Sequence, residues 1–166
     1  AVTRINPGCI EWVGKGNLIV GGPKGKEFEE TLSCLNASYA EEVSSILWNK
    51  LLLNVAINPL AAICGVKNGE LRKEPLLSQS ESTMIEAANI ARALGVSIDE
   101  DHQLLAKLHS VLDSTSENLC SMLVDVKAGR ETEIDMLCGQ VVSRGESLGI
   151  PTPLNGMLLS QIKALK

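Results

Sequence analysis

The stretch Trp48–Asn68, WNKLLLNVAINPLAAICGVKN, decides how this chain folds and where its chemistry would lie. Its apolar residues predict a core helix, but Lys50, Asn54 and Asn58 interrupt them at a strict four-residue spacing. On an α-helix this spacing stacks the three side chains on one face, one turn apart. Asn is a mediocre residue for a helix interior, because its side chain competes with the backbone for hydrogen bonds. The pattern therefore predicts a polar row on an otherwise apolar helix, called the Lys–Asn ridge below.

The end of this stretch carries further signals. Pro59 removes a backbone donor inside the helix, so we expect a kink at that level. Gly65 and the Asn68-Gly69 pair provide turn chemistry, which places a third Asn near the kinked end. The alternative interpretation is that Lys50 and the mid-helix Asn side chains simply face water, and that Asn68 only forms a turn.

Composition narrows the function classes. The 166 residues suit one domain, or one domain plus part of another. Hydrophobic residues make up 45% of the chain but aromatic residues only 2%, so we expect an aliphatic core. The net charge of −5, without a basic stripe, argues against nucleic acid as a partner. Polar residues and a proline interrupt the longest apolar run, so we expect no membrane span, and we expect no signal peptide at the start.

The cysteines and histidines indicate neither disulfides nor a metal site. Five cysteines, an odd number without close pairs, are typical of reduced thiols in a cytoplasmic protein. A reactive cysteine is the alternative, but nothing near Cys34 or Cys64 in the sequence would activate it. His102 and His109 have no Cys or His neighbours at metal-ligand spacing, so no metal is expected.

The first 38 residues predict a small β-β-α piece. Two short runs rich in β formers, 8–14 and 17–22, flank Lys15-Gly16, and this pattern favours a hairpin. A short amphipathic helix is expected over 26–37, with its apolar face formed by Phe28, Leu32 and Leu35. A lone hairpin is marginal in water, so we interpret this piece as the edge of a larger sheet whose other strands are absent.

From residue 39 onward the pattern is helical, with a capping box predicted at 97–100 and another at 114–117. Six or so helices joined by short loops are expected. They span about 40–64, 75–94, 97–112, 114–127, 132–148 and 152–164. The predicted fold class is mainly α: a compact multi-helix domain over 39–166, preceded by a short β-hairpin and helix over 1–38.

A long ordered series of spaced residues then carries a resemblance. The series is Trp48-x-Lys50, Asn54, Asn58-Pro59, Asn68-Gly69, Ser121-Met122, Asp125, Gly129-Arg130-x-Thr132-Glu133-Ile134-Asp135, Gly139, Gly149 and Thr152-Pro153-x-Asn155. Over about residues 5–166 it resembles the C-terminal half of the ketopantoate reductase (2-dehydropantoate 2-reductase) family. The resemblance implies a helical domain like the C-terminal domain of phosphogluconate dehydrogenase. It also implies that 1–38 is the last β-β-α piece of a Rossmann domain.

The same resemblance implies an oxidoreductase that uses NADPH to reduce ketopantoate, or a similar 2-keto acid, to pantoate in pantothenate and coenzyme A biosynthesis. Lys50 would be the catalytic lysine. The substrate-binding residues would be Asn54, Asn58, Asn68 and Ser121.

Glu133 matches an acidic residue at the cleft of that family, where it would contact the cofactor, hold a substrate hydroxyl or fix Lys50. The alternative is a carboxylate favoured at a helix start. Two departures, Cys120 and Cys138, stand where the family often has Ser and Asn. They affect the polar lining near Ser121, not the Lys–Asn ridge.

The cofactor would be bound mainly by a Rossmann domain, because this sequence has no G-x-G-x-x-G after a strand. We therefore expect the chain alone to be inactive and to self-associate, with a homodimer as one form. Two alternatives stay open: a sibling reductase acting on another 2-keto acid, and a non-catalytic helical interaction module whose ridge is covered by core or partner.

Overall fold

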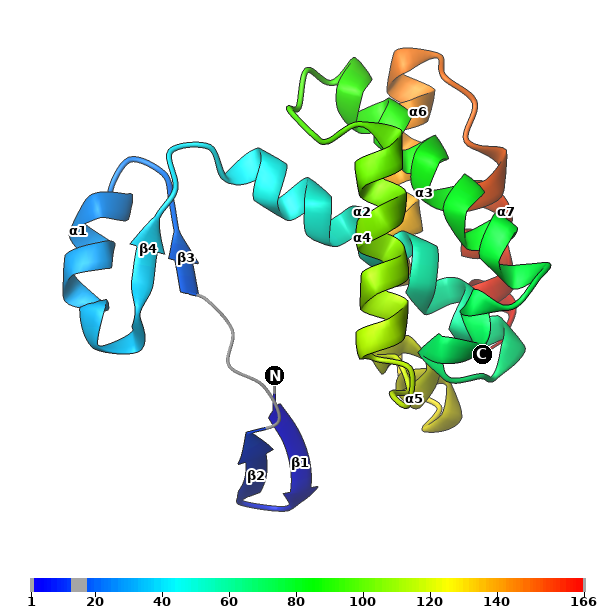
Figure 1. Cartoon of the computed structure of the whole chain (residues 1–166), viewed down its shortest axis with the longest axis horizontal. Helices are drawn as coiled ribbons and strands as arrows, with labels where there is room; N and C mark the ends of the chain where they lie inside the picture. The colour runs from blue at the N-terminus through cyan, green and yellow to red at the C-terminus, as the bar shows by residue number, and fades with distance from the viewer. Residues whose placement is uncertain (1, 13–17, 166) are drawn as a thin grey trace. The chain divides into compact units, whose positions relative to one another are not determined.

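The structure is a computed structural model that describes residues 2–12 and 18–165. It divides into two compact units, Ala1–Ser44 and Ser45–Lys166. The first holds short strands and one short helix, and the second is helical (Figure 1). The protein is therefore mainly α with a short N-terminal β piece, as the sequence predicts.

The first unit contains a hairpin, but not between the expected strands. β1 (Val2–Asn6) pairs antiparallel with β2 (Cys9–Trp12). Pro7 and Gly8 form the turn, and Gly8 has a φ of 81°, which glycine adopts without a steric penalty. The Pro-Gly pair is a stronger turn signal than the expected Lys15-Gly16, which lies outside the described residues.

The second predicted strand pairs elsewhere. β3 (Leu18–Val20) is parallel to β4 (Ala37–Tyr39), and α1 (Gly25–Thr31) connects them through the 3₁₀ turn η1 (Ser33–Leu35). The predicted hairpin between 8–14 and 17–22 is therefore wrong for the described residues of the two runs. Leu18–Val20 belong to a β-α-β unit instead, because the chain after α1 returns as a strand.

The helix predicted over 26–37 is shorter than expected. Asn36 adopts a left-handed conformation with φ 54°, which ends η1 and lets the chain turn into β4. The expected apolar face is not a buried one in this unit. Phe28 is 52% exposed and Leu35 is 60% exposed.

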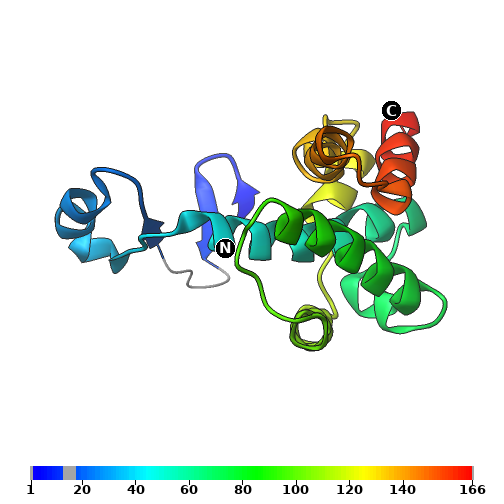
Figure 2. The same ribbon diagram turned by 90° about the horizontal axis from the view of Figure 1, so that it is seen from above.

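The second unit contains the helices that position the ridge. Their bounds are α2 (Val43–Cys64), η2 (Asn68–Arg72), α3 (Leu76–Ala93), α4 (Asp101–Ser114), α5 (Ser121–Lys127), η3 (Glu133–Met136), α6 (Cys138–Leu148) and α7 (Pro153–Ala164). Within this unit, α6 and α7 lie on one side of α2, and α4 lies on the other (Figure 2). Gly95 and Gly149 follow α3 and α6 with positive φ, as expected of residues that stop a helix.

Two predicted helix starts are wrong, and one predicted helix is divided in two. α4 is preceded by Glu100, whose carboxylate and the Gln103 amide form the capping box, in place of the box expected at 97–100. The box expected at 114–117 does not form, because the Thr115 hydroxyl donates to the Val111 carbonyl at 2.6 Å and so helps to end α4. The helix expected over 132–148 breaks at Leu137, where φ −103° and ψ −98° are not helical.

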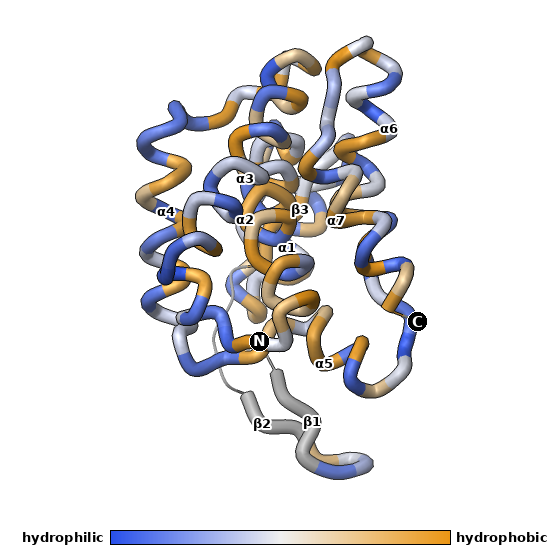
Figure 3. The backbone as a smooth tube through the Cα atoms, turned by 90° about the vertical axis from the view of Figure 1, so that its right-hand side faces the viewer, coloured by the Kyte–Doolittle hydropathy of each residue, from blue (hydrophilic) through white to orange (hydrophobic). Residues whose placement is uncertain are grey.

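The core surrounds the second half of α2. Figure 3 shows hydrophobic residues along this helix, where Leu52, Val55 and Ala61 are fully buried.

By length and composition α2 could also span a membrane, contrary to the expectation from its polar interruptions. Core helices pass the same test, and 44% of its most apolar window is buried within the protein.

Candidate functional site

The Lys–Asn ridge lies on one helix, as its spacing predicts. Lys50, Asn54 and Asn58 all belong to α2, and Lys50 and Asn58 are about 12 Å apart along the helix axis. Lys50 is exposed, whereas Asn54 and Asn58 are half-buried. In the part of the chain that the structure describes, Lys50 has no ion pair. The ammonium is therefore free to meet a ligand.

Side chains of other helices bind the backbone of α2 around Pro59. The Ser80 hydroxyl of α3 is 0% exposed and donates to the Ala56 carbonyl at 2.7 Å. Ala56 precedes Pro59 by three residues, where a proline loosens the helical hydrogen bonds. Ser80 therefore fixes the helix between Asn54 and Asn58.

Ser121 lies near the Asn58 end of the ridge. Its neighbour Cys120 precedes α5, and the Cys120 thiol donates to the Asn58 carbonyl at 3.5 Å. Cys120 is buried and Ser121 is exposed. The first residue of α5 is thereby held beside the C-terminal half of α2.

Asn68 belongs to the same region, but only 7% of it is exposed. Its backbone N–H donates to the Asn118 carbonyl at 3.0 Å, and its Nδ2 donates to the Thr115 hydroxyl at 3.0 Å. Only Oδ1 has no hydrogen-bond partner among the described residues. Asn68 therefore connects η2 to the loop that leads into Ser121.

Gly69 permits this close approach. A Cβ at Gly69 would lie 2.8 Å from the Ser116 Cβ, nearer than two such carbons can come. The Gly69 N–H also donates to the Ser116 carbonyl at 3.1 Å. The Asn-Gly pair thus forms a packed junction and not simply a surface turn.

Glu133 lies on a different element. It is exposed in the first turn of η3, which packs against α6 and α7. The neighbouring Asp135 forms a 2.6 Å ion pair with Lys163 of α7. No hydrogen bond joins Glu133 to α2 within residues 2–12 and 18–165. The structure thus joins Asn58 and Asn68 to the segment 115–120 that precedes Ser121, but does not link Glu133 to them.

The sequence did not indicate one contact of α6 with Trp48 of α2. The Arg144 guanidinium of α6 lies 5.9 Å from the centre of the Trp48 ring, a cation–π contact. Trp48 precedes Lys50 by two residues. Neither Arg144 nor Ser80 has a sequence signal for its role, because both contacts arise only when separate helices pack.

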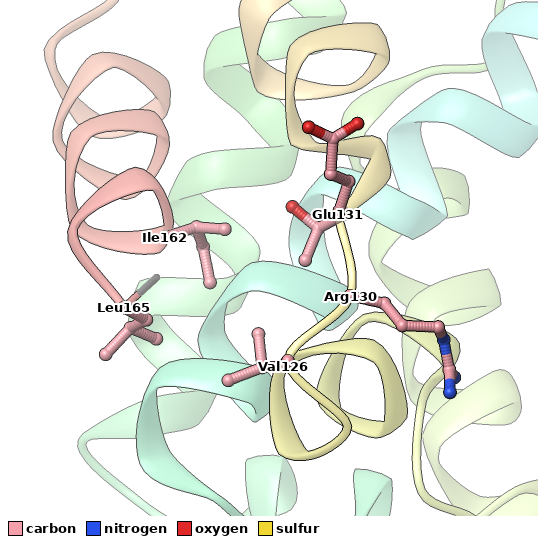
Figure 4. A pocket seen from close by; sticks show the side chains of 7 residues that line it. Val126, Arg130, Glu131, Ile162 and Leu165 are labelled. Carbon is pink, nitrogen blue, oxygen red and sulfur yellow. The ribbon is translucent and has the colours of Figure 1, made fainter.

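A separate cavity of about 190 Å³ lies between α5, the following loop and α7. Figure 4 shows the side chains of Val126, Ile162 and Leu165 around it. The Thr132 hydroxyl oxygen on its wall is buried and has no partner among the described residues. The cavity contains none of the predicted site residues, although Thr132 directly precedes Glu133.

The helices α2–α7, with the Lys–Asn ridge on α2, place this chain in a class of helical C-terminal domains. A family model described as "Ketopantoate reductase PanE/ApbA C terminal" matches residues 42–166, and the chain belongs to this family. The chain is 35% identical over 167 residues to 2-dehydropantoate 2-reductase of Pyrococcus horikoshii, covering 95% of this chain and 55% of that protein. It thus spans about half the length of the curated relatives it matches.

Solved structures show the same fold. A PanE/ApbA family ketopantoate reductase from Ralstonia eutropha JMP134 superposes with a TM-score of 0.90 at 29% identity, over 99% of this chain and 56% of that one. D-mandelate dehydrogenase, solved with NADH and anilino(oxo)acetate, also has a TM-score of 0.90, over 99% of this chain and 57% of that one. At 21% identity, this second likeness concerns the fold alone.

Proposed function

We propose that this chain is the substrate-binding and catalytic part of an NADPH-dependent 2-dehydropantoate 2-reductase, which reduces ketopantoate to pantoate in the pathway to pantothenate. The observation that carries the proposal is the exposed Lys50 on one helix with Asn54 and Asn58, in a chain of the ketopantoate reductase family. Its five free cysteines fit a cytoplasmic location.

Lys50 would perform the proton chemistry. When hydride from NADPH reaches the ketone carbon, negative charge develops on the ketone oxygen. An ammonium that donates a hydrogen bond to this oxygen stabilises that charge and can transfer a proton to it. Lys50 is suited to this role because it is exposed and has no carboxylate partner in the described part of the chain.

The carboxamides and the serine would orient the keto acid. Asn54 and Asn58 are half-buried, so their side chains are held by packing while part of each stays accessible. Ser121 is exposed beside the Asn58 end and would donate its hydroxyl proton to the substrate carboxylate. Asn68 would contribute through Oδ1, which has no partner among the described residues, or through its second Nδ2 hydrogen, because Thr115 accepts only one of the two.

The described residues do not fit a dinucleotide phosphate site. Two glycines after β3 serve packing: a Cβ on Gly21 would lie 2.0 Å from Val43 Cγ2, and one on Gly25 would lie 2.6 Å from the Tyr39 ring. We therefore place the main NADPH contacts on a Rossmann domain and assign to this chain only Glu133, as a carboxylate that faces the cofactor. We divide the chain accordingly into a Rossmann piece, 1–38, and a helical domain, 39–166.

A second candidate is a reductase of the same architecture that acts on another 2-keto acid. The same fold occurs in D-mandelate dehydrogenase. The interaction module requires a covered ridge, whereas Lys50 is exposed and Asn54 is only half-buried.

The test is a turnover assay of the intact gene product with NADPH and a panel of 2-keto acids that includes ketopantoate. We expect the highest kcat/KM for ketopantoate. A higher value for another acid would select the sibling reductase. The absence of NADPH oxidation with every acid would contradict both enzymatic assignments.

A further inference from the structure

No step of the proposed reaction requires Cys120, yet its thiol makes hydrogen bonds to two elements of the predicted site, α2 and α5. It accepts from the Leu123 N–H at 3.4 Å and donates to the Asn58 carbonyl at 3.5 Å. A thiol has one hydrogen to donate and lone pairs to accept with, so both contacts can form at once.

The first contact fixes the start of α5. Cys120 has φ −65° and ψ 154°, the extended backbone of a residue that caps a helix N-terminus. Its sulfur satisfies the N–H of Leu123, one of the amides that a helix leaves without a partner in its first turn. Because Ser121 is the first residue of α5, this cap sets the backbone from which the serine hydroxyl projects.

The second contact fixes α5 to α2. The carbonyl that accepts from Cys120 belongs to Asn58, the last residue of the Lys–Asn ridge, 62 positions earlier in the chain. Asn58 is followed by Pro59, which lacks the backbone N–H that would form a helical hydrogen bond. One sulfur atom thus connects the backbone of Asn58 with that of Leu123, in the first turn of the helix that begins at Ser121.

The thiol is also kept in the form that can donate. Cys120 is only 6% exposed. Burial raises the pKa of this thiol above its ordinary value, so it remains protonated and retains the hydrogen that Asn58 accepts.

We propose that Cys120 is a positioning residue, whose thiol holds Ser121 of α5 at a fixed place relative to Asn58 of α2. The proposal rests on the proposed function, because it takes Asn58 and Ser121 as contacts of the keto acid. It extends that function by adding a buried residue that acts on substrate only through its two neighbours.

The kinetic test compares Cys120→Ala with Cys120→Ser in the intact gene product. The alanine variant loses both hydrogen bonds, so we expect the KM for ketopantoate to rise by about five- to tenfold with kcat within about twofold. The serine variant retains a donor and an acceptor and should return KM to within about twofold of the starting value. Cys120→Val, which fills the volume without donating, repeats the test if the alanine variant does not fold.

Cys138→Ala is the matched control, because it removes the other buried thiol. Cys138 is 0% exposed and has no side-chain hydrogen bond among the described residues. This variant should lower the melting temperature without raising KM. An equal rise of KM in Cys138→Ala and Cys120→Ala would indicate general loosening of the core and would overturn the proposal, as would an unchanged KM in Cys120→Ala.

A readout without substrate separates this proposal from the proposed function. In the 166-residue chain, amide hydrogen exchange of Leu123 should be faster in Cys120→Ala and restored in Cys120→Ser. Unchanged exchange in the alanine variant would refute the positioning role. If the gene product reduces no ketopantoate, the proposed function fails, while the exchange measurement still decides whether the thiol holds α5.

Discussion

At the scale of single residues, Lys50 differs from several other lysines of the second unit, because those lysines form ion pairs and Lys50 does not in the part of the chain that the structure describes. Lys67, Lys73, Lys107 and Lys163 each meet a carboxylate, whereas Lys50 meets none within the described residues. An ion pair would hold the ammonium away from a ketone oxygen. The missing partner is therefore the electrostatic condition that the proposed proton transfer requires.

Lys50→Ala should lower kcat for ketopantoate by about 10²- to 10⁴-fold, because it removes the proposed proton donor. Its free energy of unfolding should change by less than about 0.5 kcal/mol, because Lys50 is exposed. Steady-state kinetics and chemical denaturation of the intact gene product measure the two quantities. Lys127→Ala, at another exposed lysine, should leave kcat unchanged. Near-normal turnover in Lys50→Ala would end the assignment.

The buried thiol of Cys138 predicts a loss of stability in alkali. Burial raises its pKa from the ordinary 9.0 to about 12. Above pH 9 the unfolded chain loses this proton before the folded chain does, so the stability present below pH 9 declines toward pH 12. The contribution has a slope of up to about 1.4 kcal/mol per pH unit.

Urea denaturation between pH 8 and 11 measures this slope. Cys138→Ala should show a shallower decline than the unaltered chain. Cys34→Ala, at an exposed thiol, should keep the full slope. Identical slopes in all three proteins would contradict the prediction.

At the scale of elements, α7 is anchored by a carboxylate of another helix. Glu86 of α3 accepts from the Leu154 N–H at 3.0 Å, and from the N–H and Nδ2 of Asn155 at 2.8 and 2.9 Å. A negative charge at a helix N-terminus also interacts favourably with the helix dipole. Because α7 packs against η3, this anchor helps to place the element that carries Glu133.

Glu86→Ala should reduce the free energy of unfolding by about 1–3 kcal/mol, because Asn155 is fully buried and its donors would lose their acceptor. Thermal or urea unfolding of the 166-residue chain is the measurement. Glu146→Ala, at an exposed carboxylate of α6, is the control and should change stability by less than about 0.5 kcal/mol. A similar small change in Glu86→Ala would show that the anchor is not needed.

The elements also show how far the sequence could predict this protein. The helical spacing of apolar residues, the glycines that end helices and Pro153 at a helix start predict α2, α3 and α7. These signals suffice because each acts within a few residues of the chain. Cap signals misplaced α4 and α5, because several Ser, Thr, Asp and Glu residues compete there and only packing selects among them. The ridge was predictable from spacing within one helix. The contacts of Ser80, Cys120 and Arg144 were not, since each joins residues far apart in the chain.

At the scale of the whole molecule, the first unit exposes apolar residues that a finished sheet would cover. Leu18 and Ile19 of β3 are 36% and 39% exposed, and Phe28 is 52% exposed. In the described residues, β3 pairs only with β4, so its other edge has unpaired backbone groups. Such edges and apolar surfaces promote association.

The 166-residue chain should therefore self-associate through this unit and fail to turn over ketopantoate by itself. Sedimentation velocity over a range of concentrations measures the association. The double variant Phe28→Ser and Leu35→Ser should shift the distribution toward monomer, whereas Leu148→Ser in the second unit should not. A clean monomer of the unaltered chain at high concentration would refute the prediction.

The junction at the end of α2 has a consequence for how the chain folds. The bond from Asn68 to Thr115 joins residues 47 positions apart, and that from Cys120 to Asn58 spans 62. Neither can form until the intervening α3 and α4 have folded back, since closing such loops costs entropy that local helices do not. The contacts around the C-terminal half of α2 would thus be among the last parts to consolidate during synthesis, after the helix itself has emerged.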